Sequence, residues 1–162
     1  MLIAGVLTVS DKGSRGERND ISGIIVQEYI NRLPGKVEKY EIIPDEKEII
    51  SAKLIEWADE LGFDIIITTG GTGLSPRDVT PEATVLVIDK VIPGLAEAMR
   101  IETMKKSPTA VLSRAIAGSR GKCLIVNLPG SPGGVRECFE VILPVLSHAV
   151  DTLAGKIQEH PS

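Results

Sequence analysis

A short run of glycine and threonine residues, Thr69-Gly70-Gly71-Thr72-Gly73, directly follows an apolar segment of the chain. Glycine has no Cβ atom, so such a loop can turn several backbone N–H groups toward one anion without steric cost. It is not a P-loop, because the sequence contains no GxxxxGK[ST] pattern, and the dinucleotide-binding pattern fails because Leu74-Ser75-Pro76 follows the last glycine. A phosphate cradle and a plain tight turn are therefore the two alternatives for this loop.

A charged segment, Arg77-Asp78-Val79-Thr80-Pro81-Glu82, comes next and leads into a predicted helix. We expect Thr80 to cap this helix, with Pro81 in its first turn. The helix then has no structural need of Asp78 at its start. This carboxylate is a candidate Mg²⁺ ligand or organiser of a phosphate, and the alternative is a solvated loop carboxylate.

A second carboxylate, Asp45, follows another predicted strand. Glu48, three residues later, gives Asp45 a structural alternative as half of a helix capping box. Its position at the carboxyl end of a strand nevertheless places it at the same edge as Asp78 in an open parallel sheet. Two carboxylates at that edge could hold Mg²⁺ against phosphate oxygens.

A second glycine-bearing loop, Pro129-Gly130-Ser131-Pro132-Gly133-Gly134, precedes the last predicted helix. It is a second candidate anion or nucleotide site, with an ordinary strand-to-helix turn as the alternative. No nucleophile is recognisable: GxSxG is absent, and Cys123 and Cys138 lack CxxC spacing and are expected to be buried. We expect His148 to be a packed or surface residue of the last helix and His160 to lie in the tail. An enzyme with this sequence would act by positioning and charge stabilisation.

Four apolar, β-rich runs must position these loops, at residues 2–9, 37–43, 64–69 and 122–127. Three of them are nearly continuous hydrophobics, which is typical of strands covered on both faces in a mostly parallel sheet. Helical periodicity lies between the runs, at 21–33, 45–62, from 80, at 93–104 and at 134–153, where Pro144 predicts a kink. The pattern predicts an α/β fold whose loops all project from the carboxyl edge of the sheet.

The totals favour one domain, over residues 1–155, with a short tail at 156–162. The 162 residues carry 18 Lys and Arg against 22 Asp and Glu, for a formal net charge of -4, which disfavours nucleic acid and anionic membranes as partners. The N-terminal apolar run has no basic lead-in and is too short to span a bilayer. We therefore expect a soluble, cytoplasmic protein.

The fifteen residues from Thr69 to Ala83 resemble the signature of the molybdopterin adenylyltransferases and their molybdopterin-binding relatives. Agreement continues at residues 8–11, 20–23, 44–46, 112–114 and 127–130, and covers the chain from Leu2 to about Leu153. The resemblance implies a three-layer α/β/α sandwich with a mostly parallel sheet, usually assembled as a trimer. It also implies transfer of AMP from MgATP to the terminal phosphate of molybdopterin, with release of pyrophosphate and a possible hand-over to a molybdenum insertase.

By the same resemblance, Asp45 and Asp78 match the catalytic carboxylates and would hold Mg²⁺ with ATP as co-substrate. Ser131 is a departure, because relatives often carry Asn or Gln at this position of the PG-x-P loop. The predicted substrate-binding positions are Ser10, Asp11, Thr69, Gly70, Gly71, Thr72, Gly73, Arg77, Thr80, Glu82, Ser113, Asn127, Pro129, Gly130 and Ser131.

Three other functions compete with this one. A non-catalytic molybdopterin-binding or scaffold protein is disfavoured because both Asp45 and Asp78 are present. The related domain of nucleotide-pyrophosphatase or competence-associated proteins is disfavoured by the intact segment 77–82 and the PG-x-P loop. A Rossmann dehydrogenase is disfavoured because this sequence lacks the glycine fingerprint of such enzymes.

Overall fold

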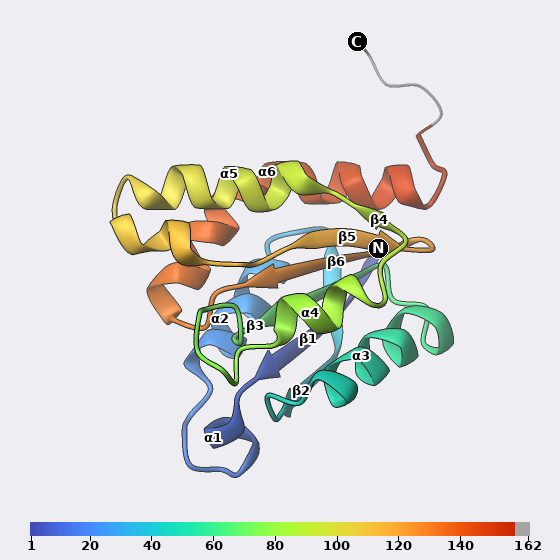
Figure 1. Ribbon diagram of the computed structural model, residues 1–162. Coiled ribbons are helices and arrows are strands. Elements are labelled where there is room, and N and C mark those ends of the chain that lie inside the picture. Colours follow the sequence, from blue (N-terminus) through green and yellow to red (C-terminus); the bar gives the residue numbers. More distant parts are fainter. Residues whose placement is uncertain (158–162) are drawn as a thin grey trace.

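The four predicted strands form the parallel part of one sheet in the computed structural model, which describes residues 1–157 (Figure 1). The sheet has six strands in the order β2-β1-β3-β6-β5-β4. β1 pairs in parallel with β2 and β3, and β3 pairs in parallel with β6. These strands are β1 (Leu2–Val9), β2 (Gly35–Ile43), β3 (Ile65–Thr69) and β6 (Cys123–Leu128).

The two remaining strands are antiparallel and were not predicted. β5 (Ala117–Arg120) pairs antiparallel with β6, and β4 (Lys90–Val91) pairs antiparallel with β5. The sequence of β5 is Ala-Gly-Ser-Arg, which has neither alternating apolar residues nor β-branched ones. Only its pairing with the buried strand β6 makes it a strand, so the mostly parallel sheet is confirmed with an antiparallel edge.

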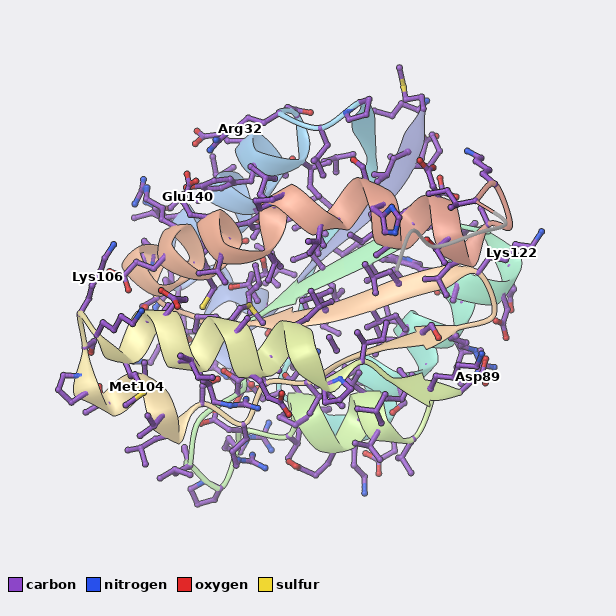
Figure 2. The ribbon with its side chains drawn as sticks, turned by 90° about the horizontal axis from the view of Figure 1, so that it is seen from above. Arg32, Asp89, Met104, Lys106, Lys122 and Glu140 are labelled. Atoms are coloured by element: carbon purple, nitrogen blue, oxygen red, sulfur yellow. The ribbon has the colours of Figure 1, made fainter. Side chains whose placement is uncertain are left out.

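Helices cover both faces of the sheet, which confirms the predicted three-layer α/β/α fold (Figure 1). One face carries α2 (Ile21–Ile30), α5 (Pro93–Met104) and α6 (Pro132–Leu153), and the other carries α3 (Lys47–Ile55), its π-helical continuation Glu56–Glu60, and α4 (Thr80–Val85). Seen from above, α5 and α6 lie side by side across the sheet (Figure 2). Two short helical turns, α1 (Asp11–Ser14) and η2 (Pro108–Leu112), complete the fold.

The central strand β3 separates two hydrophobic cores. Ile65 and Ile67 pack into the core under α2, α5 and α6, whereas Ile66 packs into the core under α3 and α4. All three side chains are fully buried. Successive residues of a strand point to opposite faces, so a continuous apolar run is what a strand covered on both sides requires.

The predicted helices were confirmed with shifted ends. α5 has the predicted bounds, and α6 begins at Pro132 and runs past Pro144. The predicted apolar face of α2 was partly wrong, because Ile21 and Ile24 are 57% and 51% exposed. Among the helices of residues 1–157, none combines the length and apolarity that a membrane span requires.

Candidate functional site

The loops that follow β1, β2, β3 and β6 meet at the carboxyl edge of the sheet, as the parallel register requires. Their backbones are joined directly. The Thr69 hydroxyl donates to the Pro129 carbonyl at 2.7 Å, and the Gly70 N–H donates to the Leu128 carbonyl at 3.1 Å. The predicted convergence of these loops is therefore confirmed.

The glycine loop after β3 depends on its glycines for two separate reasons. Gly70 and Gly71 have φ values of 101° and 70°, in the left-handed region that side chains disfavour. A Cβ atom on Gly70 would lie 2.3 Å from the Val9 carbonyl oxygen, and one on Gly71 would lie 2.3 Å from Oγ1 of Thr80. At Gly70 and Gly71 the loop therefore packs its backbone against β1 and α4 with no room for a side chain.

Thr80 holds this loop and does not cap α4. Its buried hydroxyl donates to the Gly70 carbonyl at 3.0 Å, and its N–H donates to the Gly71 carbonyl at 3.1 Å. Thr80 is the first residue of α4, and the preceding Val79 provides no side-chain cap. The predicted cap was wrong because a residue inside the first turn points its side chain away from the orphan N–H groups.

Asp78 ends the segment between the glycine loop and α4. Its Oδ2 accepts a hydrogen bond from the Ser75 N–H at 3.1 Å, and its own N–H donates to the Ser75 carbonyl at 2.9 Å. Asp78 therefore orders a local turn before α4, a structural task that was not predicted, and it does not cap the helix. Its Oδ1 accepts no hydrogen bond within residues 1–157 and is available to a ligand.

Asp45 faces Asp11 from the end of β2. The Asp11 N–H donates to Oδ2 of Asp45 at 2.9 Å, and the Asp45 N–H donates to Oδ1 of Asp11 at 3.0 Å. The predicted capping box of Asp45 and Glu48 was wrong. The N-cap of α3 is Glu46, which makes no side-chain capping bond. Asp45 precedes the cap position and is engaged by the loop after β1.

Arg77 ties the two acidic loops together at the rim of the site. It donates two hydrogen bonds to the Asp11 carboxylate, both at 3.0 Å, and a third to Glu46 at 3.0 Å. These bonds hold the pKa of Asp11 below its ordinary value. The pKa of Asp45 is raised instead, because burial disfavours its charge and the charges of Asp11 and Asp78 add repulsion. Asp45 is thus a partly buried carboxylate among like charges, an environment that a cation would relieve.

The second glycine-bearing loop is held by side chains. Oγ of Ser131 accepts from the Gly134 N–H at 3.1 Å and caps α6. The Ser22 hydroxyl, at the start of α2, donates to the Gly130 carbonyl at 2.7 Å. Ser22 was given no role from the sequence, although it lies in a segment that carries the family resemblance, because its partner is more than a hundred residues away.

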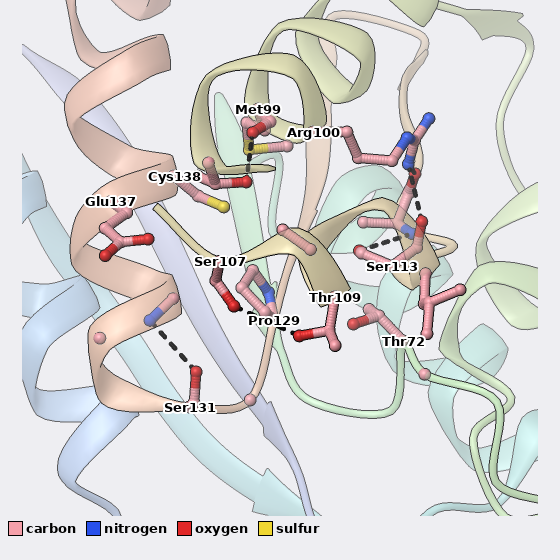
Figure 3. Close-up of a pocket in the computed structure, with 18 of the residues that line it drawn as sticks. Thr72, Met99, Arg100, Ser107, Thr109, Ser113, Pro129, Ser131, Glu137 and Cys138 are labelled. Atoms are coloured by element: carbon pink, nitrogen blue, oxygen red, sulfur yellow. Dashed lines mark hydrogen bonds between the residues drawn. The ribbon is translucent and has the colours of Figure 1, made fainter. Parts of the chain in front are cut away.

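A cavity of about 540 Å³ opens between the two glycine-bearing loops and the helices α5, η2 and α6 (Figure 3). This volume is in the range of small-molecule sites. Its apolar walls include Met99 and Cys138, and its charged lining residues are Asp78, Arg100 and Glu137. The predicted site residues that line it are Gly71, Thr72, Gly73, Asp78, Ser113, Pro129, Gly130 and Ser131.

Sequence reasoning missed Arg100 and Glu137, because each is a charged position of a long helix, outside the strand-end loops that carried the site signals. Arg100 donates to the carbonyls of Ala115 at 2.8 Å and Ser113 at 3.2 Å and so fixes the segment after η2 (Figure 3). Cys138 is an unreactive wall, because burial raises its thiol pKa to about 11. Cys123 is also a buried free thiol, as predicted, with a pKa of about 12 for the same reason.

The other predicted residues lie near the cavity without lining it. The acidic cluster next to the cavity contains Ser10, Asp11, Asp45 and Arg77. In it, Oγ of Ser10 caps α1 by accepting a hydrogen bond from the Gly13 N–H at 3.0 Å. The side chains that are fully buried or paired within the protein belong to Thr69, Thr80, Glu82 and Asn127.

Asn127 shows how such a residue supports the site. Its amide donates to the hydroxyls of Thr68 at 2.9 Å and Thr84 at 3.1 Å, and its carbonyl accepts from the Ile116 N–H at 3.3 Å. It therefore joins β3 and α4 to β6 from a fully buried position. His148 is an exposed residue of α6, and His160 lies outside the described residues.

The fold and site define a class: an α/β domain with a cavity at the carboxyl edge of its sheet, lined by two glycine-bearing loops. The family described as "Probable molybdopterin binding domain" matches residues 5–148, and the chain belongs to that family. The resemblance seen in the sequence is thereby confirmed.

Named relatives agree with this assignment. A molybdopterin adenylyltransferase of Helicobacter pylori is 45% identical over 96% of this chain and 89% of its own length. The molybdenum cofactor synthesis protein cinnamon of Drosophila melanogaster is 42% identical over 94% of this chain but only 26% of its own length. The crystal structure of the molybdopterin biosynthesis enzyme MoaB of Thermus thermophilus superposes with a TM-score of 0.92 at 52% identity, covering 98% of this chain and all of that one.

Proposed function

We propose that this protein is a molybdopterin adenylyltransferase of molybdenum cofactor biosynthesis, which joins molybdopterin to AMP derived from ATP. The observation that carries the proposal is the position of Asp45 and Asp78 beside two glycines of the same loop, Gly71 and Gly73. A Cβ atom on Gly71 would lie 3.1 Å from Oδ1 of Asp45, and one on Gly73 would lie 2.9 Å from Oδ2 of Asp78. Both carboxylates therefore meet whatever the loop backbone binds.

The two compartments of the site suit two different substrates. The cavity beside Met99 and Cys138 has the size and the apolar walls for a pterin, with Arg100 and Glu137 as polar partners at its edge. The acidic cluster of Asp11 and Asp45 does not line this cavity, lies next to Gly71 of the glycine loop, and suits a metal-bound triphosphate. Adenylyl transfer needs both substrates to meet at one phosphorus atom, and the glycine loop is the structure that both compartments share.

The reaction follows from this arrangement. An oxygen of the terminal phosphate of molybdopterin forms a bond to the α-phosphorus of ATP, the bond from that phosphorus to the bridging oxygen breaks, and pyrophosphate leaves with the electron pair. The protein contributes alignment and backbone N–H dipoles toward the developing negative oxygens. No covalent protein intermediate is needed, which agrees with the raised thiol pKa of Cys138 in the cavity wall.

The residues present fit a magnesium ion. Within residues 1–157 no group of three His, Cys, Asp or Glu side chains could enclose a metal. Mg²⁺ seldom needs such a cage, since it keeps several waters and binds through one or two carboxylates and substrate phosphates. Oδ1 of Asp45 and Oδ1 of Asp78 each accept no hydrogen bond within the described part of the chain, and these oxygens would hold the ion. Bound there, Mg²⁺ would neutralise phosphate charge.

The experiment is a pyrophosphate-release assay on the purified protein with MgATP, with and without molybdopterin. We expect release only when both substrates and Mg²⁺ are present, and loss of release when EDTA removes the metal. A protein that binds molybdopterin but releases no pyrophosphate would instead be the non-catalytic binding protein of the same family, and the proposal would be wrong.

We further propose that the protein acts as a homotrimer and passes its product to a molybdenum insertase. Exposed apolar side chains on α2 and η2, among them Ile21, Ile24, Val111 and Leu112, support burial against other copies. The small share of cinnamon that the chain matches supports a function in series with further domains. Light scattering should give about three times the 17.3 kDa chain mass, and a monomer at micromolar concentration would contradict the trimer.

A further inference from the structure

Arg114 bridges both ends of the segment that joins the glycine loop to α4. Its Nε donates to the Gly73 carbonyl at 2.8 Å, and its Nη2 donates to the Asp78 carbonyl at 2.8 Å. Its backbone N–H donates to the Thr72 carbonyl at 2.8 Å. One residue from the loop between η2 and β5 thus holds the end of the glycine loop and the backbone of Asp78 together.

Glu82 fixes the third arm of this guanidinium. Nη1 of Arg114 donates to the Glu82 carboxylate at 2.6 Å, from the first turn of α4. The hydrogen bond to Arg114 holds the pKa of Glu82 below its ordinary value, so the pair stays ionised at neutral pH. Glu82 therefore orients the fork that reaches Gly73 and Asp78, and this gives a structural role to a residue that the sequence predicted as a substrate contact.

Besides Arg114, the segment is tied to the rest of the protein by the side chain of Arg77, which bonds to Asp11 and Glu46. Residues 74–77 are exposed, and in the described part of the chain a single backbone–backbone hydrogen bond, from the Asp78 N–H to the Ser75 carbonyl, lies within the segment. Arg114 does not line the cavity of about 540 Å³ and faces a separate surface groove with Lys47 and Leu86. Its route to the site is therefore through the loop, and the side chain is not placed to touch a ligand in the cavity.

We propose that Arg114 is a positioning residue that sets the carboxylate of Asp78 against the glycine loop for adenylyl transfer. This inference rests on the proposed function and deepens it. Bridging two carbonyls and one carboxylate needs the planar guanidinium fork, which a lysine ammonium cannot reproduce. The charge of Arg114 alone is consequently not enough for the role.

The test compares Arg114→Lys, Arg114→Met and Glu82→Gln with wild type in steady-state pyrophosphate release and in a molybdopterin titration. A displacement of about 1 Å in a reacting group can cost about 100-fold in rate, so we expect kcat to fall about 10- to 100-fold in both Arg114 variants. The KM for ATP and the Kd for molybdopterin should stay within about threefold of wild type. The kcat of Glu82→Gln should lie between those of wild type and the Arg114 variants, since the Arg114 guanidinium remains but loses the carboxylate that orients it.

Arg120 offers a matched control at the opposite edge of the sheet, where β6 begins. It makes the same kind of contacts, with two hydrogen bonds to Asp59 at 3.0 and 2.7 Å and one to the Val87 carbonyl at 2.8 Å. Arg120→Met should lower the melting temperature about as much as Arg114→Met while leaving kcat unchanged. Millimolar guanidinium should restore part of the turnover of Arg114→Ala and none of that of Asp78→Asn.

Three outcomes would overturn the role of Arg114. A wild-type kcat in Arg114→Lys would show that a positive charge suffices. Equal kcat values in Arg114→Met and Arg120→Met would show that the role of Arg114 is purely structural. A rise in the molybdopterin Kd that matches the fall in kcat would show that Arg114 acts in substrate binding.

Failure of the proposed function is recognised separately, as a wild-type protein that releases no pyrophosphate. Amide hydrogen exchange then still decides the role of Arg114 in holding the loop. Arg114→Met should speed exchange at residues 73–78 and Arg120→Met should not, and equal protection in the two variants would refute the inference.

Discussion

The two glycine-bearing loops of the site look alike in sequence but are held in place by different interactions. Gly70 and Gly71 have positive φ and no space for a Cβ atom. In the loop 129–134 no glycine has positive φ. A Cβ atom on Gly134 would meet only the loop's own side chains, with Oγ of Ser131 at 2.7 Å, and one on Gly133 would meet nothing within 4 Å. The first loop is specified by its backbone, whereas the second is specified by the side chains of Ser22, Thr69 and Ser131 that bond to it.

This difference assigns the two loops different tasks. A backbone locked against β1 and α4 keeps its N–H groups in one arrangement and costs no reorganisation when charge develops on a ligand. A loop held by three hydroxyl contacts shapes a binding cavity and tolerates change at individual positions. The region from Gly70 to Asp78 is therefore expected to govern turnover, and the region from Pro129 to Gly134 to govern binding.

The largest effect is expected for Asp78→Asn. Asn keeps an acceptor for the Ser75 N–H and removes the charge, and loss of one preorganised electrostatic element costs about 3 kcal/mol, or two to three orders of magnitude in kcat. Molybdopterin affinity should survive, because only interactions that strengthen in the transition state are lost. Pyrophosphate release and a molybdopterin titration measure the two quantities.

Asp151→Asn, near the end of α6 and far from the loops, is the matched control and should behave as wild type. Turnover of Asp78→Asn within about threefold of wild type would remove Asp78 from the reaction. An equal fall in molybdopterin affinity would place it in substrate binding and erase the division of tasks between the loops.

The next effect is expected for Gly71→Ala. The left-handed conformation alone costs a side chain about 1–2 kcal/mol, and the new Cβ atom would displace the Thr80 hydroxyl, so the free energy of unfolding should fall by at least about 2 kcal/mol. Gly133→Ala in the other loop should change stability by less than about 1 kcal/mol, in the stabilising direction. Urea denaturation of both variants compares them, and equal losses would contradict the distinction between the loops.

Ser131→Ala should have a smaller effect. It removes the side-chain cap of α6 and should cost about 1 kcal/mol in the free energy of unfolding. Ser131→Asn restores a capping acceptor and should recover most of that stability. If the second loop governs binding, molybdopterin affinity of Ser131→Ala should fall more than its kcat, and the reverse order would show that this loop also serves turnover.

The smallest effect is expected for Arg77→Met, as a shift in the pH dependence of activity. The pKa of Asp45 lies above its ordinary value, so ionised Asp45 disfavours the folded state above that pKa, and protonation on acidification relieves the penalty. Asp11 has a lowered pKa, so its stabilising contribution is present above the ordinary value and is lost as the pH falls through the lowered one.

Removing Arg77 takes away a charge that lowers both pKa values. Both should rise, and the acid limb of activity should move to higher pH by less than about 1 unit, since an exposed ion pair contributes under about 1 kcal/mol. NMR titration of the Asp45 and Asp11 carboxyl carbons measures the shifts. An unchanged Asp45 pKa would show that Arg77 affects only Asp11, in the loop after β1.

Prediction from the sequence was most successful where burial produces a regular pattern of apolar residues along the chain. Continuous apolar runs predicted the strands β1, β3 and β6, and the apolar stripe of α6 was confirmed by buried Val135, Phe139 and Leu146. The convergence of the four loops followed from parallel pairing alone. The antiparallel edge strands β4 and β5 had no such pattern, because pairing with β6 is what orders them.

Local capping rules failed where a distant partner took the polar group. Asp45 and Thr80 both occupy positions that predict a helix cap, yet Asp45 bonds to Asp11 and Thr80 bonds to Gly70. A hydroxyl or carboxylate near a helix start can satisfy either the helix or a neighbouring loop, and sequence spacing measures only the first.

The sequence by itself determined the layered fold, the sheet edge at which the glycine-bearing loops meet, and the carboxylates and glycines proposed for the site. These depend on hydrophobic periodicity, on strand direction and on residue types that suit few other conformations. Tertiary structure alone decided that Arg114 bridges Gly73 and Asp78, that Ser22 tethers Gly130, and that Arg100 and Glu137 complete the cavity. The physical reason is that these contacts join segments far apart in the chain, and their geometry exists only once the two cores have packed the helices against the sheet.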